Sequence, residues 1–481
     1  MGVRSFKGAA APGVFDAWTQ NYEEGIVSDT QDKITISSRR RLDGSKIFVI
    51  ITWTLLVLFF AGAAGITWYP TLSARWSAKV TPLAIPGTSA YPGNHQAEFK
   101  GVATGADGSV VAVGRTDSTT GVFRRGLGNA DAFIVRIGPD GKAWSGIYGG
   151  QSDDIFNAVT VQPDGTIIAV GSTMSIDGDF GKVSVEGPGA VVAAISPNNK
   201  LLWHKTLGTS GCTEFVAVSL TPNGNIVAAG QTGPCNPSPG SPTSWMYATD
   251  NALVMLSPQG DLLWSQVYGP FAGVNFTSVT TTSNGDIVAA GYSTNVADGP
   301  YACVPGHMRC GVIILVTPTG QLEWAKTLTE VGTNPHDGQF RGISINGDGN
   351  IVAVGDTMND DCWAVALTPD GTTIWNKTYL TTIGTTSLFT SAATATDGNI
   401  IAAGMRSLNA VDNIGVPMVV MLDSQGDLGW TYAGGGTNPE SLSSIAVMPD
   451  GHIVAAGSMN NKSTSANFAY LIALNSDGTL T

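Results

Sequence analysis

A short apolar run that follows a tight turn and ends in glycine recurs seven times along this chain. The first copy reads DGSVVAVG over 107–114. The copies end at Gly114, Gly171, Gly230, Gly291, Gly355, Gly404 and Gly457. Self-similarity at intervals of 49 to 64 residues indicates a repeat architecture.

Each copy has the same neighbours along the chain. An aromatic-led strand with a small residue two places later precedes the Asp-Gly or Asn-Gly turn, which is typical of a short hairpin. A third apolar strand, a second short turn and a strand that opens on tryptophan follow. The leading residues are Phe99, Phe156, Phe215, Phe276, Phe340, Phe389 and Leu442, and the tryptophans are Trp144, Trp203, Trp264, Trp324, Trp375 and Trp430. Four antiparallel strands repeated seven times predict an all-β, seven-bladed β-propeller.

The seventh unit reaches residue 481 without a tryptophan strand. Residues 75–80, which include Trp76, resemble the fourth strand of the other units but follow no first strand. We therefore predict that this N-terminal strand completes the last blade and closes the ring, which leaves no open sheet edge. The propeller is expected over 76–481.

A run of 23 uncharged residues over 47–69 is long enough to cross a bilayer as a helix. The basic residues Arg39, Arg40, Arg41 and Lys46 precede it, so the positive-inside rule predicts a single-pass cell-membrane protein with a cytoplasmic N-terminus and an extracytoplasmic propeller. Residues 1–46 are expected to be a disordered cytoplasmic tail, and 70–75 a short linker that holds the tight-turn face near the bilayer. A cleaved signal peptide is the alternative interpretation of this segment.

All five cysteines lie in the predicted propeller. Cys212 and Cys235 flank one hairpin, and Cys303 and Cys310 share one loop, so both pairs are expected to be disulfides in an oxidising compartment. Cys362 is expected to be a buried free thiol.

Polar residues just before the first strands are the candidate ligand-binding set, because they should surround the mouth of the channel on the face with variable loops. They are Glu98, Asp154, Glu214, Asn275, Gln339 and Glu440. Their side chains would suit a protein or glycan partner, and their oxygens would also suit a calcium ion. The net charge of −13 repels phosphate backbones, so no nucleic-acid partner is expected.

The DG-x-I-V-A-A-G and G-x-x-x-W elements resemble the repeats of uncharacterised bacterial membrane-anchored β-propellers and, more loosely, quinoprotein blades. The resemblance covers about 76–481 and implies the fold rather than an activity. A quinone-dependent dehydrogenase would be expected to have an adjacent cysteine pair, which this sequence lacks.

The sequence shows no catalytic constellation, so it favours a binding or scaffold module at the cell surface over an enzyme. Two alternatives stay open. A transmembrane sensor would signal through the N-terminal tail, and a glycan-active enzyme would need acidic side chains that converge in a pocket at the channel mouth.

Overall fold

The computed structural model describes residues 87–481 except for 124–125, 182–187, 208–211, 234–249, 269–272, 295–298, 304, 331–336, 380–385, 408–414, 435–439 and 462–465. The described residues belong to one compact unit, Ser77–Thr481. The predicted tail, membrane span and linker lie outside them. In the part of the chain that the structure describes, no helix is long and apolar enough to cross a bilayer.

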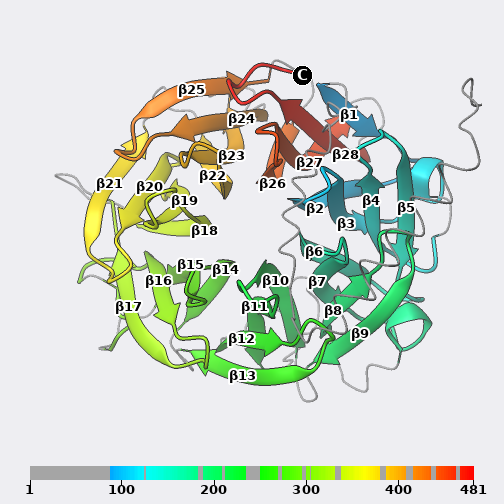
Figure 1. Cartoon of the computed structure of the whole chain (residues 1–481), viewed down its shortest axis with the longest axis horizontal. Helices are drawn as coiled ribbons and strands as arrows, with labels where there is room; N and C mark the ends of the chain where they lie inside the picture. The colour runs from blue at the N-terminus through cyan, green and yellow to red at the C-terminus, as the bar shows by residue number, and fades with distance from the viewer. Residues whose placement is uncertain are drawn as a thin grey trace, which may run out of the picture. The chain divides into compact units, whose positions relative to one another are not determined.

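The described strands form seven four-stranded antiparallel sheets, arranged as blades around a ring (Figure 1). The innermost strands are β2 (Ala97–Thr104), β6 (Asp154–Val161), β10 (Cys212–Leu220), β14 (Val274–Thr281), β18 (Gly338–Ile345), β22 (Ser387–Thr394) and β26 (Glu440–Val447). The second strands are β3 (Val110–Thr116), β7 (Ile167–Thr173), β11 (Ile226–Gly233), β15 (Ile287–Ser293), β19 (Ile351–Thr357), β23 (Ile400–Ser407) and β27 (Ile453–Asn461). The predicted seven-bladed propeller is confirmed.

The outer half of each blade completes this arrangement. The third strands are β4 (Asp131–Ile137), β8 (Gly189–Ile195), β12 (Asp250–Leu256), β16 (Cys310–Val316), β20 (Cys362–Leu367), β24 (Gly415–Leu422) and β28 (Ala466–Leu474). The outermost strands are β5 (Ala143–Tyr148), β9 (Leu201–Leu207), β13 (Leu262–Tyr268), β17 (Leu322–Leu328), β21 (Thr373–Tyr379), β25 (Leu428–Ala433) and β1 (Thr88–Tyr91). Blade 1 is β2–β5, and the numbering continues to blade 7, which combines β26–β28 with β1. Two short 3-10 helices, η1 (Gly121–Phe123) and η2 (Gly178–Phe180), lie in the second-to-third-strand loops of blades 1 and 2.

The antiparallel order gives the ring two different faces. Short turns between first and second strands, and between third and fourth strands, lie on what we call the turn face. The connections from second to third strand and from blade to blade lie on the opposite, loop face.

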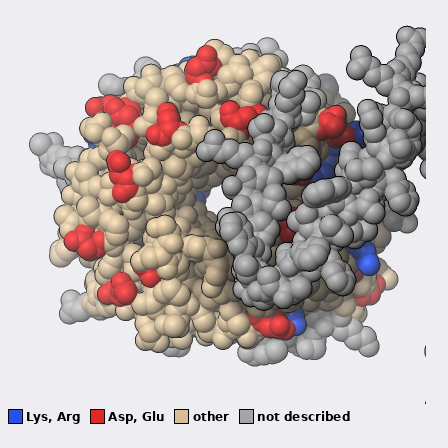
Figure 2. Space-filling model, in the orientation of Figure 1, with Lys and Arg blue, Asp and Glu red and all other residues tan. Residues whose placement is uncertain are grey.

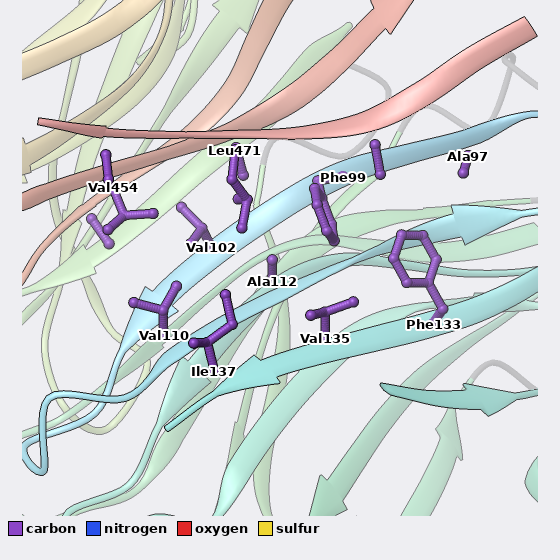
Figure 3. Close-up of a cluster of buried hydrophobic side chains, with 14 of the residues drawn as sticks. Ala97, Phe99, Val102, Val110, Ala112, Phe133, Val135, Ile137, Val454 and Leu471 are labelled. Carbon is purple, nitrogen blue, oxygen red and sulfur yellow. The ribbon is translucent and has the colours of Figure 1, made fainter. Parts of the chain in front are cut away.

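The hydrophobic core is divided among the blade interfaces, one cluster for each neighbouring pair. Between blades 7 and 1, for example, Val454 and Leu471 pack against Phe99, Val110 and Phe133 (Figure 3). Second and third strands are buried on both faces, as their unbroken apolar runs predict. Every blade is therefore stabilised by both of its neighbours.

The repeated glycine is required by a bulge in the neighbouring strand. In every blade the pairing of the first two strands shifts by one residue just after the leading Phe or Leu, as between Phe99 and Gly101. The bulge brings the carbonyl oxygen of Glu98 to 1.9 Å from where a Cβ on Gly114 would stand. Only glycine fits beneath such a carbonyl, which explains the recurrence.

The tryptophans join neighbouring blades on the turn face. Trp144 Nε1 donates to the Pro197 carbonyl oxygen of blade 2 at 2.8 Å. Trp264 makes the same bond to Pro318 at 3.0 Å, and its ring lies over Gly320. Each indole thus covers the outer turn of the next blade.

The N-terminal strand closes the ring, but it is not the predicted one. The strand that pairs with β28 is β1, whereas Trp76 and the rest of 75–80 lie outside the described residues. The prediction failed because we identified fourth strands by their tryptophan. β1 has no tryptophan and instead matches other outer strands at its C-terminal end. Tyr91 pairs with Ala469 as Tyr148 pairs with Ala132 in blade 1.

The first described residue, Gly87, and the last residue, Thr481, meet at one residue of β28. The Ala473 carbonyl accepts from Thr481 N at 3.2 Å, and Ala473 N donates to the Gly87 carbonyl at 2.9 Å. In blade 1 the corresponding residue, Arg136, faces Trp144. We call this joint the seam. Because the closing strand begins at Thr88 rather than at Trp76, the distance argument that placed the turn face near a bilayer no longer applies.

Candidate functional site

At the loop face, the first and second strands of each blade end in one cross-strand pair of residues. We call these residues the mouth positions. Each pair consists of the residue before the leading Phe or Leu and the residue after the repeated glycine. The pairs are Glu98 with Arg115, Ile155 with Ser172, Glu214 with Gln231, Asn275 with Tyr292, Gln339 with Asp356, Leu388 with Met405 and Ser441 with Ser458. The leading aromatics pack toward the preceding blade. Side chains alternate along a strand, so the mouth positions point the other way. Figure 2 shows the opening at the centre of the ring.

Hydrogen bonds link the mouth positions of blades 3 and 4, and Asn157 of blade 2 bonds to one of them. Asn157, just after the leading Phe of blade 2, donates through Nδ2 to Glu214 Oε1 at 2.7 Å. Gln231, the partner of Glu214, donates to Asn275 Oδ1 at 2.8 Å. Two of the predicted residues, Glu214 and Asn275, therefore belong to one network.

The network continues into blades 4 and 5 with charged groups. The Arg309 guanidinium stacks 4.7 Å from the centre of the Tyr292 ring and donates to Gln339 Oε1 at 3.4 Å. Gln339 Nε2 donates to Asp356 at 3.2 Å, and Arg341 forms an ion pair with Asp356. We call the whole series, from blade 2 to blade 5, the mouth belt. It fixes the orientation of Gln339, a third predicted residue.

Glu98 lies apart from the belt, in a cavity between blades 7 and 1. The cavity has a volume of about 240 Å³, and Gln96, Glu98, Arg115, Asp117 and Asn467 line it. Gln96 Oε1 accepts from Asn467 N at 2.7 Å, which ties the two blades together across the cavity. We call it the mouth cavity. The residues that line it carry two carboxylates, one guanidinium and two side-chain amides.

The charges of the mouth cavity are partly paired yet open to solvent. Glu98 lies 3.0 Å from Lys100, and the Glu98 side chain is 31% exposed. Arg115 is 3.9 Å from Asp153 and 45% exposed. A ligand can therefore reach both groups without breaking a buried ion pair.

Asp154 and Glu440 do not occupy mouth positions, in contrast to the prediction. Each stands one place earlier in its strand, and a one-residue shift turns a side chain to the opposite face of a sheet. Asp154 is buried and accepts from Ser175 Oγ at 2.7 Å, from Gly150 N at 2.8 Å and from Thr173 Oγ1. Burial raises the pKa of Asp154. This carboxylate anchors loops within blade 2.

Glu440 is half-buried at the start of β26. Desolvation raises its pKa, and the Tyr470 hydroxyl donates to it. Its carboxylate thus faces a side chain of the third strand of its own blade.

One predicted disulfide is confirmed. Cys303 and Cys310 are bonded, with Cα atoms 5.5 Å apart. The loop they close is held by Asp337, whose carboxylate lies 3.0 Å from His307 Nδ1. Cys235 and the Cys212 side chain lie outside the described residues, so the second pair stays a prediction. Cys362 is free and buried, as expected, and burial raises its pKa, which disfavours a nucleophilic thiolate.

The structure gives no support to a calcium site at the mouth. Within the described ranges, no three His, Cys, Asp or Glu side chains lie close enough together to hold a metal ion. Mouth carboxylates such as Glu98 and Glu214 stand in different blades.

Several mouth residues were missed from the sequence. Arg115, Gln231 and Asp356 all follow the repeated glycine directly, so the repeat itself could have identified them. Arg309 stands in a long loop, and no pattern indicates that it stacks on Tyr292. Asp117 lies beyond the end of β3, and no sequence pattern identified it as a site residue.

The sequence matches no protein-family model, and no curated protein shows significant similarity to it. Among solved structures, the chain is similar to Kuenenia stuttgartiensis hydrazine synthase, with 12% identity, a TM-score of 0.46 and coverage of 79% of this chain and 96% of that one. It is also similar to the polysaccharide lyase Uly1, with 11% identity, a TM-score of 0.46 and coverage of 80% and 90%. A Dyadobacter fermentans protein of unknown function has 12% identity, a TM-score of 0.44 and coverage of 81% and 100%. Resemblances at this level bear on neither the ligand nor the chemistry of this chain.

Proposed function

We propose that this protein is a membrane-anchored binding propeller that takes a protein or glycan partner at the loop face. The mouth cavity carries the proposal. Its carboxylates, guanidinium and amides offer donors and acceptors of both charge signs, as recognition of a polar or hydroxyl-rich segment requires. The mouth belt extends this polar surface through blades 2 to 5.

The proposed location is the extracytoplasmic side of the cell membrane, with residues 1–46 in the cytoplasm. The uncharged run over 47–69 and the basic residues before it support this topology. The disulfide between Cys303 and Cys310 supports an oxidising compartment. The visible face in Figure 2 carries more acidic than basic groups, which disfavours binding to phosphate-rich polymers.

A glycan-active enzyme is the second candidate, because Glu98 and Asp117 share one cavity. A general acid must hold its proton near neutral pH, and an uncharged environment favours that state. Glu98 instead lies 3.0 Å from the Lys100 ammonium and its side chain is 31% exposed, so its surroundings are neither uncharged nor closed to water. The geometry therefore favours binding over catalysis.

The test is a glycan array probed with the full-length protein in lipid nanodiscs, followed by affinity measurements on each positive glycan. We expect Glu98→Gln and Arg115→Gln each to weaken binding about tenfold, the cost of a charged hydrogen bond. The exposed outer-strand variants Lys205→Gln and Glu323→Gln are controls and should bind like the wild type.

Unchanged affinity in both cavity variants would refute the mouth cavity as the site. Release of shorter glycans, abolished by Glu98→Gln, would establish the enzyme instead. If no glycan binds, a protein partner is left, and cross-linking from residue 98 in cells should then yield an adduct that Arg115→Gln removes.

A further inference from the structure

A second pocket lies on the turn face, between blades 3 and 4, far along the strands from the mouth. Its volume is about 620 Å³, within the range of ligand sites. Trp264, Leu263 and Pro318 form its apolar wall, and Asn223, Asn225 and Asn284 supply polar groups. We call it the turn-face pocket.

The described lining of the turn-face pocket has no charged residue. In the other five blades, the first residue of the Asp-Gly or Asn-Gly turn is an aspartate. The first turns of five blades carry aspartate there: Asp107, Asp164, Asp348, Asp397 and Asp450. Blades 3 and 4 carry Asn223 and Asn284 instead, and no charged side chain lines the pocket among the described residues. A neutral ligand is therefore favoured over an anion or a cation.

The apolar wall is exposed and rigid. Leu263 is 49% exposed and its neighbour Leu262 is 53% exposed. The Trp264 ring is fixed by its bond to Pro318 and by Gly320, which lies against one side of it. A wall held in place before binding loses little entropy when a ligand arrives.

Two amides of the pocket, those of Asn223 and Asn225, have unused hydrogen-bonding capacity. Asn225 is half-buried, and the partner of its Nδ2 is the Met255 sulfur at 3.8 Å, a weak acceptor. Asn223 Oδ1 accepts from the Thr221 hydroxyl, while its Nδ2 has no acceptor in the part of the chain that the structure describes. Asn223 and Asn225 can therefore still donate to the hydroxyl groups of a sugar ring, whereas Asn284 already accepts from the Thr282 hydroxyl and donates to Asp286 at 2.7 Å.

We propose that the turn-face pocket binds a neutral glycan, with the indole and leucine against the apolar face of a sugar and the asparagines on its hydroxyls. An extended proline-rich peptide would also seek an aromatic wall, but it needs an indole N–H for its carbonyl groups. The Trp264 N–H is already donated to Pro318. The pocket is therefore better matched to hydroxyl groups than to a peptide backbone.

The test measures binding of cellohexaose, chitohexaose and mannohexaose to the full-length protein by calorimetry in nanodiscs, which avoids glycoside detergents. We expect at least one of them to bind, and Asn225→Ala to weaken it about tenfold or more. Asn350→Ala is the matched control, since Asn350 holds the same turn position in blade 5 and does not line the pocket. Leu263→Asp, a change at an exposed side chain, should weaken binding as well.

The mouth variant Glu98→Gln separates this site from the proposed function, because it should leave hexaose binding at the turn face unchanged. The proposal is overturned if no hexaose binds, if Asn225→Ala binds as well as Asn350→Ala, or if Glu98→Gln alone abolishes binding. Binding of a decaproline peptide in place of the sugars would likewise overturn it.

Discussion

Asp131 is a carboxylate whose surroundings do not satisfy it. It is buried at the start of β4, and its Oδ1 has no hydrogen-bond partner in the described part of the chain. The other oxygen accepts from Leu127 N at 2.8 Å. Burial is the main cause that raises the pKa of Asp131, and the nearby charges of Asp154 and Asp179 raise it further.

The stability of the propeller should therefore depend on Asp131. A group whose pKa is higher in the folded state contributes stability below its unfolded pKa, and that contribution is lost as pH rises through the folded value. Asp131→Asn removes the charge, so we expect Tm to rise by about 1–2 °C at pH 7. At pH 4 the gain should be smaller.

Thermal unfolding of both proteins at the two pH values measures this difference. Glu323→Gln, which removes an exposed carboxylate on the outer strand of blade 4, is the control and should unfold like the wild type at both pH values. An equal effect of Asp131→Asn at both pH values would contradict the assigned cause.

For single residues, the sequence predicted the place in the strand better than the face of the sheet to which the side chain points. Glu98, Glu214, Asn275 and Gln339 precede a leading Phe directly, and the repeat places them alike. Asp154 and Glu440 were grouped with them by their polarity and nearness to the strand start. A single residue of register separates the two sets, and composition does not specify register.

Among the elements, β1 is the strand that joins the N-terminal side of the propeller to blade 7. It pairs with β28 through four residues, and Tyr91 packs edge-on against Phe99 with ring centres 5.4 Å apart. Tyr91 also contacts the core between blades 7 and 1. The closing strand is thus held by its backbone pairing and by this aromatic contact.

We expect Tyr91→Ala to destabilise the propeller by about 2 kcal/mol, less than for a fully buried aromatic ring. Tyr91→Phe keeps the contact and should unfold like the wild type. Thermal unfolding gives the stability, and limited proteolysis shows whether cleavage begins near β1. A Tm for Tyr91→Ala equal to that of Tyr91→Phe would show that this contact does not hold the seam.

Most elements followed from the repeat because each blade encodes its own four-strand pattern. The apolar runs, the turn chemistry and the tryptophans all agree with one another, and this consistency identified the blades. The closing strand was misplaced because it lies outside any complete repeat. Its partner is set by long-range pairing between Thr88 and Ile472, which no local pattern encodes.

For the whole molecule, the ring places the two proposed sites on opposite faces. The mouth cavity is lined by Glu98, which precedes the leading Phe, and Arg115, which follows the repeated glycine. The turn-face pocket is lined by the Asn-Gly turns of blades 3 and 4. Both rely on a scaffold whose blades are each packed between two neighbours. A change in one pocket should therefore leave the other intact.

The seam also determines how the ring would respond to force. A pull on the N-terminal end enters at Gly87 and is transmitted along β1, which lies antiparallel to β28. A force along a strand shears all of its interstrand hydrogen bonds at once. The four-residue pairing of β1 with β28 therefore bears the load. In single-molecule stretching between the N-terminus and Ser407 on the loop face, we expect detachment of β1 before any blade unravels. Tyr91→Ala should lower that rupture force and Tyr91→Phe should not, whereas rupture that begins in another blade would contradict this view. In a chain held by its N-terminus, tension would thus be released by the detachment of β1 before a complete blade unravels.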